Sequence, residues 1–401
     1  MRMNTLARIT GAILLSTCAA GAAFAADGLV IHEWGTLTSL EDENGQAIAG
    51  INADDEPAPS FVHRIAPGLL LPSTLIASNS KGVPRVHPDV TVRLETPVLY
   101  VHAPPGFAGP LEVTVKFLGG WLTEFYPDAQ AEAPGINTKT FHVGHISAET
   151  VGTLHWEGLK IGGDPAGPAT DARVWLAPRN VAADGIRTPA GESEKFLFYR
   201  GVGHTGQILA ISRDKKTGGL RAEPNEDPSS NPPFWLADIR PDGAAAFQFI
   251  GAFGKSHPFQ EADYSAANIA LLRASLEAAL IHTGLYKDEA EALLNTWEVS
   301  YFKTPGLRAF YLWPRKWLDW LLPLTVSPEA AITRVMVGRI ELVTPEERTV
   351  MARIGSSAES LELYDGLGRF REALLLDEER RRPAPGLEQF LQRMSIAYYT
   401  P

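Results

Sequence analysis

Cysteine is nearly absent from the 401-residue chain, because Cys18 is its only cysteine. This residue lies in an N-terminal segment that has the pattern of a cleaved leader. A mature chain without it would have no disulfide, no thiolate nucleophile, no cysteine-ligated zinc and no attached c-type haem.

An excess of basic residues is also missing. The chain has 36 Lys and Arg against 47 Asp and Glu, a net charge of −11, so a general nucleic-acid binder is not expected. Hydrophobic residues make up 45% and charged residues 21%, as in ordinary globular proteins. The apolar stretches after the N-terminal segment are short or amphipathic, so no integral membrane segment is expected in the mature protein.

The N-terminus predicts export. Arg2 and Arg8 flank the first residues, an apolar run follows from Ile9 to Ala23, and small residues end the segment at Ala25. The run has about 15 residues, shorter than the ~20 that a spanning helix needs. We therefore expect a signal peptide over 1–25 and a periplasmic or secreted protein. Lipoprotein anchoring through Cys18 is the weaker alternative, because Thr17 fits poorly before a lipid-modified cysteine.

Residues 27–257 are predicted to form a β-rich domain, because 36 Gly and 30 Pro accompany short runs rich in Val, Ile, Thr and aromatic residues. Helical crossovers are missing there, so the expected fold class is α+β with an antiparallel β-sandwich or jelly-roll-like N-terminal domain. Asn44-Gly45 has the residues of a tight hairpin turn. The expected strands are Leu29 to Leu40, Val90 to His102, Leu111 to Phe117, Thr153 to Ile161, Arg173 to Ala177, Lys195 to Arg200, Gln207 to Ser212 and Ala245 to Phe253.

Residues 258–401 are predicted to be mainly helical and packed against the β domain. Apolar residues recur at three- and four-residue spacing from Ala266 to Ile281. Further helices are expected at Asp288 to Trp297, Arg315 to Leu321, Asp365 to Arg381 and Gly386 to Tyr398. The β-branched stretch Ile332 to Val343 predicts one late strand that returns to the sheet.

Several segments read as motifs, among them HEWGT (32–36), RLETPVLY (93–100) and FYRGVG (198–203). Together they resemble an uncharacterised family of exported bacterial proteins. The resemblance spans most of the mature chain and implies export, but it brings no activity, substrate or assigned site.

The glycines at 201, 203 and 206 match the GxGxxG pattern of dinucleotide-binding proteins. That function requires a helix after the glycines, whereas the next residues predict a strand. No nicotinamide cofactor is expected.

Histidines and carboxylates crowd into the β-rich domain, and such groups together hold zinc, copper, iron or manganese. We expect His32 to meet His63 or His102 and to bind a divalent metal ion there. Glu33 or Glu95 would join this site, although strand alternation points His32 and Glu33 to opposite faces.

The alternative for these residues is structural. Partly buried histidines would bond to the backbone, and Glu33 and Glu95 would pair with arginines.

The acidic passage comprises Glu41, Asp42 and Glu43 and the cluster Asp54-Asp55-Glu56. It suggests either a calcium site or, preferably, a solvated turn, because its spacing does not match an EF-hand.

Two functions follow from these patterns. The first is a metal-assisted enzyme of the cell envelope, in which Glu33 or Glu95 acts as base and Arg200 steadies an anionic substrate. The second is a non-catalytic periplasmic module that binds a glycan or a protein. The partners expected are a small molecule, a glycan or an envelope protein.

Overall fold

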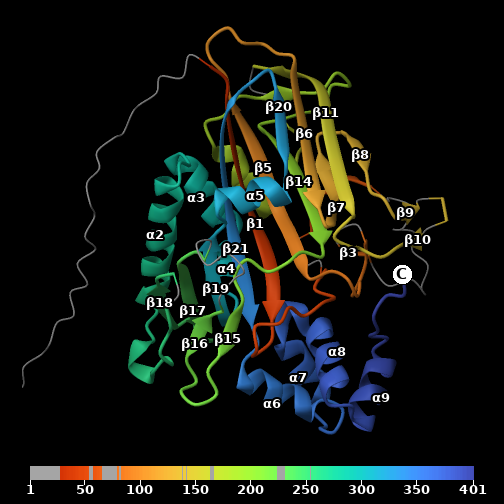
Figure 1. The fold of residues 1–401 in the computed structure, drawn as a ribbon, viewed down its shortest axis with the longest axis vertical. Coiled ribbons are helices and arrows are strands. Elements are labelled where there is room, and N and C mark those ends of the chain that lie inside the picture. The colour runs from red at the N-terminus through yellow and green to blue at the C-terminus, as the bar shows by residue number, and fades with distance from the viewer. Residues whose placement is uncertain are drawn as a thin grey trace, which may run out of the picture.

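The computed structural model (Figure 1) describes residues 28–53, 57–65, 79–80, 83–137, 139–140, 142–162, 167–223, 231–252 and 254–401. The predicted leader with Cys18 and the acidic cluster 54–56 lie outside the described residues.

One large, mainly antiparallel sheet dominates the described part of the chain. Its main path runs through β13 (Ser193–Glu194), β12 (Ile186–Arg187), β11 (Val151–Ile161), β7 (Gly120–Tyr126), β14 (Phe196–Gly203), β5 (Val92–His102), β1 (Val30–Glu41), β21 (Ala331–Leu342), β19 (Gly306–Leu312), β17 (Phe234–Ile239) and β18 (Ala245–Ile250). Off this path lie β2 (His63–Arg64), β6 (Leu111–Leu118), β8 (Gln130–Glu132) and β20 (Leu324–Ser327). Smaller pairs are formed by β3 (Asn79–Ser80) with β4 (Val83–Pro84), β9 (Ile136–Asn137) with β10 (His142–Val143), and β15 (Ile211–Arg213) with β16 (Leu220–Ala222).

The helices lie mostly in the C-terminal part of the chain, so the fold is mixed α/β. They are α1 (Arg173–Leu176), α2 (Ala267–His282), α3 (Lys287–Thr296), α4 (Glu298–Phe302), α5 (Arg315–Leu321), α6 (Pro345–Arg353), α7 (Ser360–Gly366), α8 (Arg371–Arg381) and α9 (Pro385–Arg393). None of the helices that the structure describes is long and apolar enough to span a membrane.

A strand from the N-terminal part of the chain and a late strand pair in the middle of the sheet. β1 runs parallel to β21 and antiparallel to β5, and β21 continues to β19 on its other side. Strands from the predicted β-rich region and from the predicted helical region therefore share one sheet, with β21 at the place of the expected late strand.

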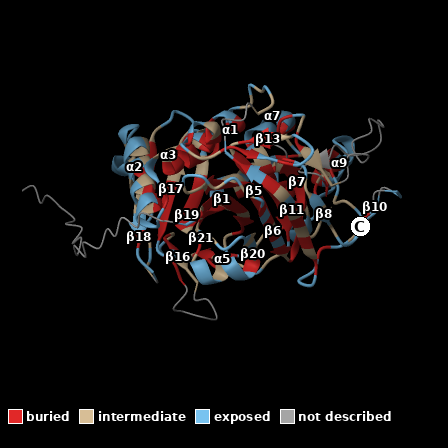
Figure 2. Cartoon of the chain, turned by 90° about the horizontal axis from the view of Figure 1, so that it is seen from above, coloured by how far each residue is buried: buried red, intermediate tan, exposed pale blue. Residues whose placement is uncertain are grey.

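β1 is buried on both faces, so its polar side chains, among them His32, Glu33 and Thr36, are buried together with its apolar ones. Ile31 and Leu37 point into a core that they share with Val113 of β6. Trp34 points the other way, into a second core formed with α2, α3 and α4. Viewed from above, β1, β5, β6, β20 and β21 lie around a common centre, because the sheet curls back on itself (Figure 2).

Several predicted elements differ from the structure in their bounds or type. Within the strand expected over 207–212, β15 begins only at Ile211, and within the helix expected over 386–398, α9 ends at Arg393. The segment 173–177, expected as a strand, forms α1 over 173–176 instead. Its buried Trp175 packs edge-on against Phe61 and Tyr126 and donates its indole N–H to Glu194 at 2.8 Å. The helix expected over 365–381 is interrupted, since α7 ends at Gly366 and α8 begins at Arg371.

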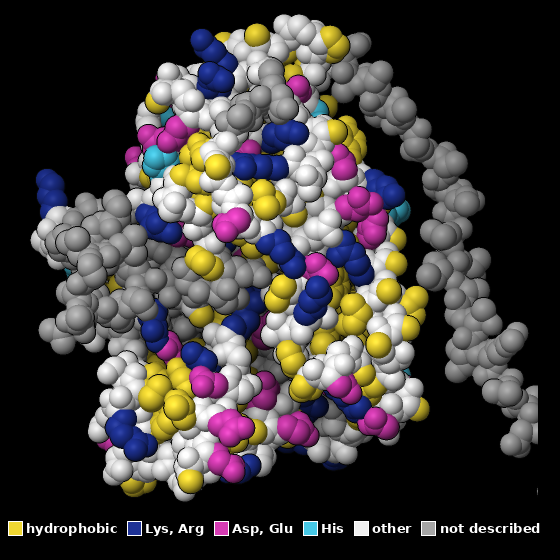
Figure 3. Space-filling model, turned by 180° about the vertical axis from the view of Figure 1, so that it is seen from behind, with side chains coloured by type: hydrophobic (Ala, Val, Ile, Leu, Met, Phe, Trp, Pro, Cys, Tyr) yellow, Lys and Arg dark blue, Asp and Glu magenta, His cyan; other side chains and the backbone are white. Residues whose placement is uncertain are grey.

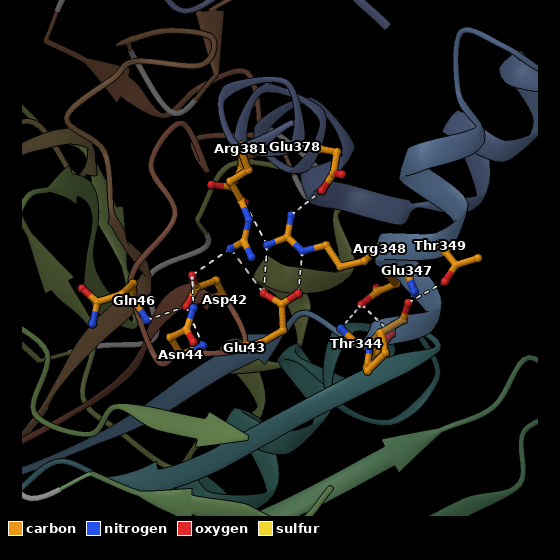
Figure 4. A network of polar contacts seen from close by, with 12 residues as sticks. Asp42, Glu43, Asn44, Gln46, Thr344, Glu347, Arg348, Thr349, Glu378 and Arg381 are labelled. Atoms are coloured by element: carbon orange, nitrogen blue, oxygen red, sulfur yellow. Dashed lines mark hydrogen bonds and ion pairs between the residues drawn. The ribbon is translucent and has the colours of Figure 1, made fainter. Parts of the chain in front are cut away.

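The acidic passage beside the Asn44-Gly45 turn is neither solvated nor arranged as a calcium site in its described part (Figure 4). Glu43 accepts hydrogen bonds from Arg348 of α6 at 2.8 and 3.1 Å. Arg381 of α8 binds Asp42 at 2.9 Å. The passage therefore anchors the C-terminal helices to the end of β1.

The surface seen from behind mixes charges of both signs, with Lys and Arg side chains interspersed among Asp and Glu (Figure 3). The opposite charges partly neutralise one another over this face.

Candidate metal centre

Three side chains from distant parts of the sequence meet beside the first turn of α3. His32 lies on β1, His102 is the last residue of β5, and Glu289 stands in the first turn of α3. In the β1–β5 register, His102 lies opposite Val30 and Tyr100 lies opposite His32. The two imidazoles are therefore diagonal neighbours on one face of the sheet.

The Glu289 carboxylate bridges the two imidazoles. Its Oε2 lies 2.7 Å from His32 Nδ1, and its Oε1 lies 3.0 Å from His102 Nε2. An ionised carboxylate only accepts hydrogen bonds, so each imidazole donates to it. The ring centroids of His32 and His102 are 5.2 Å apart.

The same three residues offer ligand atoms within 4.8 Å of one another. Ligand atoms that share one ion at bonds of ~2.1 Å are about 3.0–3.4 Å apart, so an ion would require the more distant atoms of this group to approach one another by up to about 1.5 Å and the closest pair to separate slightly. Two imidazoles and one carboxylate suit zinc, iron, copper or manganese. Three protein ligands also leave further coordination positions open.

The group is withdrawn from solvent. Glu289 is fully buried, and the His32 and His102 side chains are 4% and 16% exposed. Burial acts to raise the pKa of Glu289, but hydrogen bonds from His102, His32 and the Tyr286 backbone N–H hold this pKa at about 2. A stable carboxylate charge inside the protein is a strong attractor for a cation.

Tyr286 forms the border between this group and solvent. Its ring lies 4.5 Å from the His32 ring and 5.0 Å from the His102 ring, and the residue is 48% exposed. Two residues before Tyr286, Gly284 has a φ of +116°, a backbone conformation that favours glycine. A Cβ atom added to Gly284 would lie 3.2 Å from the Thr333 side chain. The loop before α3 therefore lies close against β21 and holds Tyr286 over the imidazoles.

Glu33 does not join the two histidines. It points to the other face of the sheet, where it binds Tyr199 and Arg334, each at 2.5 Å. This placement agrees with strand alternation, and it gives Glu33 a buried ion pair in place of the expected position beside the metal ligands.

Glu95 and Arg200 also lie apart from the imidazoles. Glu95 is opposite Thr36, four positions along β1 from His32, a separation of about 13 Å at the ~3.3 Å rise of a strand. Arg339 and Arg369 bind Glu95 at 3.3 and 3.2 Å. Arg200 is fully buried and contacts Glu124 and Thr96, each at 3.4 Å, so neither residue is placed to act on a ligand held by His32 and His102.

His63 lies elsewhere, on β2 beside β7. Its Nε2 is 2.8 Å from Glu192, and its ring stacks on Tyr126 at 6.0 Å. Of the two histidines considered as partners of His32, the structure brings in His102 and leaves out His63.

Sequence reasoning did not select Glu289. The only sequence feature that marks Glu289 is local: an acidic side chain in the first turn of a predicted helix is typical of an N-terminal cap. In the structure, Glu289 accepts a hydrogen bond from the Tyr286 backbone N–H at 2.8 Å. Nothing in the sequence shows that this turn packs beside β1.

No family model matches the chain, and no curated protein is significantly similar to it in sequence.

Proposed function

We propose that the protein is a metal-assisted enzyme of the cell envelope, with a divalent ion held by His32, His102 and Glu289. The observation that carries the proposal is the convergence of two imidazoles and one carboxylate from β1, β5 and α3. Histidines that serve only for packing have backbone or water partners available and have no need to share one buried carboxylate.

A bound ion of this kind supplies a Lewis acid and an activated water at its open positions. The residues of the chain supply the rest. Glu289 holds both imidazoles in orientation, and the buried surroundings exclude bulk water from the ligand side. Tyr286 lies where a substrate would approach, because its exposed ring is in contact with both imidazoles.

The proposal changes the roles that the sequence assigned. Glu33, Glu95 and Arg200 each hold a buried polar contact away from the imidazoles, so we assign them structural roles. The scaffold is proposed to be sandwich-like, because side chains from β1 and β5 pack in one core with side chains from β6 and β20.

The experiment is a metal analysis of protein purified from the cell envelope, followed by titration of the metal-free form with zinc, iron, copper and manganese ions. We expect about one ion per chain, and a loss of affinity of at least about tenfold in His102→Ala and Glu289→Gln. His63→Ala is the matched control, since it removes a histidine that also binds a glutamate.

Equal metal retention in the wild type and in both ligand variants would refute the proposal. The same holds if no ion binds to the folded wild-type protein. The alternative, a non-catalytic module that binds a glycan or a protein, would then take its place.

A further inference from the structure

The outer face of α2 is apolar along the length of the helix. The side chains on this face are Ala267, Leu271, Ala274, Ala278 and Ile281. All five are exposed, and the two large ones, Leu271 and Ile281, are 57% and 39% exposed. An exposed helix face is normally polar, whereas a helix that is hydrophobic on every side is normally buried. The outer face of α2 therefore has the composition of an interface.

The inner face of α2 already has its partner. Leu272, Leu276 and Leu280 pack into the core beneath the helix, on the side opposite to the outer face. α2 lies at the outer edge of the fold in Figure 1 and in Figure 2, and no element of the described part of the chain covers it there.

The apolar surface continues beside the helix onto β18. Phe249 of β18 is 58% exposed, and its ring lies 5.0 Å from the ring of Trp235. The indole N–H of Trp235 donates to the Ser275 hydroxyl at 2.8 Å, and Ser275 lies on one flank of the outer face. Phe249 therefore widens the apolar surface on that flank. Scattered exposed apolar residues are ordinary, but a contiguous patch from two elements marks an interaction site.

The spacing along the outer face indicates the kind of partner. Its residues follow one another at steps of four, three, four and three, which is the heptad spacing of helices that pack knobs-into-holes. Such a face fits a second copy of itself, as the two-fold interface of a homodimer requires. The alanines at 274 and 278 allow close approach of the two helices, while Leu271 and Ile281 provide larger contacts on either side.

The flanks of the outer face favour a parallel pair of two copies. In heptad terms Glu277 is at a g position, and His282, five residues later, is at the next e position. In a parallel pair these two positions face each other across the interface, so each Glu277 meets His282 of the other copy. A carboxylate accepts a hydrogen bond from an imidazole N–H. An antiparallel pair would bring the same flanks together and would place Glu277 near its own copy.

We infer that the protein forms a homodimer in which two copies of α2 pack in parallel through their outer faces. The 16 residues of α2 make a helix about 24 Å long, so the interface lies at the small end of specific interfaces. The dimer is therefore weak, with a dissociation constant in the micromolar range. This inference is independent of the proposed metal centre, because the outer face contains none of the three candidate ligands.

The first test is sedimentation equilibrium of the full mature chain at about 1–300 µM, a range that covers a weak dimer. We expect a reversible equilibrium between monomer and dimer. Ala274→Glu places a carboxylate against its own copy at the middle of the interface and should raise the dissociation constant at least tenfold. The variant keeps a strong helix former at an exposed position, so it should fold as the wild type does. Ala352→Glu, at an exposed position of α6, is the matched control and should dimerise normally.

The second test concerns the orientation of the two helices. The only cysteine of the chain is Cys18, in the predicted leader, so Ala278→Cys introduces the single thiol of the mature protein. A parallel pair places position 278 opposite its own copy, at the ~6 Å between Cα atoms that a disulfide spans. We expect mild oxidation to give a covalent dimer in this variant and a monomer in Ala352→Cys.

Three results overturn the inference. The first is a wild-type protein that stays monomeric up to about 300 µM, even if it binds lipid vesicles or another protein through α2. The second is a dimer that Ala274→Glu does not weaken. The third is a wild-type dimer for which Ala278→Cys gives no covalent product.

Discussion

Glu289→Gln tests whether the buried carboxylate is stabilised by its two imidazoles. The folded protein holds the pKa of Glu289 at about 2, against an ordinary value of 4.5. At about 1.4 kcal/mol for each pH unit between these values, the ionised carboxylate contributes about 3 kcal/mol to the free energy of unfolding at pH 7. Glutamine has nearly the same shape but lacks the charge, so the variant should lose most of this contribution.

The pH dependence has a definite sign. A carboxyl group whose pKa is lower in the folded state stabilises the protein above about pH 4.5, and this stabilisation is lost as the pH falls toward 2. The difference between wild type and Glu289→Gln should therefore be largest near pH 7 and should shrink below pH 4.5.

The assay is urea unfolding of both proteins from pH 7 to pH 3, with a chelator present so that metal binding does not add to stability. Glu192→Gln is the matched control, since Glu192 also binds a histidine but is one-third exposed. That variant should lose less than about 1 kcal/mol. A Glu289→Gln protein as stable as the wild type at pH 7, or a difference that does not change with pH, would refute the reasoning.

Three further predictions concern other parts of the chain. Burial raises the pKa of Glu41 to about 8, so ionisation of this residue lowers the free energy of unfolding by up to about 5 kcal/mol as the pH rises from 4.5 past 8. Glu41→Gln should therefore unfold at a higher urea concentration than the wild type at pH 9, and equal midpoints would contradict this. Arg348→Met should cost about 3–5 kcal/mol in urea unfolding at pH 7, because Glu378 stays buried without its cation and Asp377 keeps only Arg380. A loss below about 1 kcal/mol would contradict the structural role of the network. Mass measurement of the mature protein should give a chain that begins at Ala26, and a lipid-modified or uncut terminus would exclude the expected cleavage.

Local patterns were sufficient for many elements of the fold. The helix expected at 315–321 is α5, and the strand expected at 90–102 contains β5, because apolar periodicity and flanking turn residues define both. The strands β7, β17 and β19 were not expected. Their burial on both faces removes the alternation of polar and apolar residues that marks a half-exposed strand.

The sequence predicted the two histidines of the candidate site but not its carboxylate. His32 and His102 lie on neighbouring strands, and strand alternation correctly separates His32 from Glu33. Glu289 is 257 positions away from His32, and its contact depends on how α3 packs across the sheet. Such long-range packing leaves no periodic trace in a single sequence.

The pairing of β1 with β21 imposes an order on biosynthesis. β1 is among the first segments of the chain to be made, but its parallel neighbour includes residue 331 and those that follow. Until these residues emerge, one edge of β1 has no partner strand, a state prone to association with other strands. The N-terminal strand must therefore be kept from pairing wrongly until most of the chain is complete, which predicts slow, late folding and aggregation of fragments truncated before residue 331.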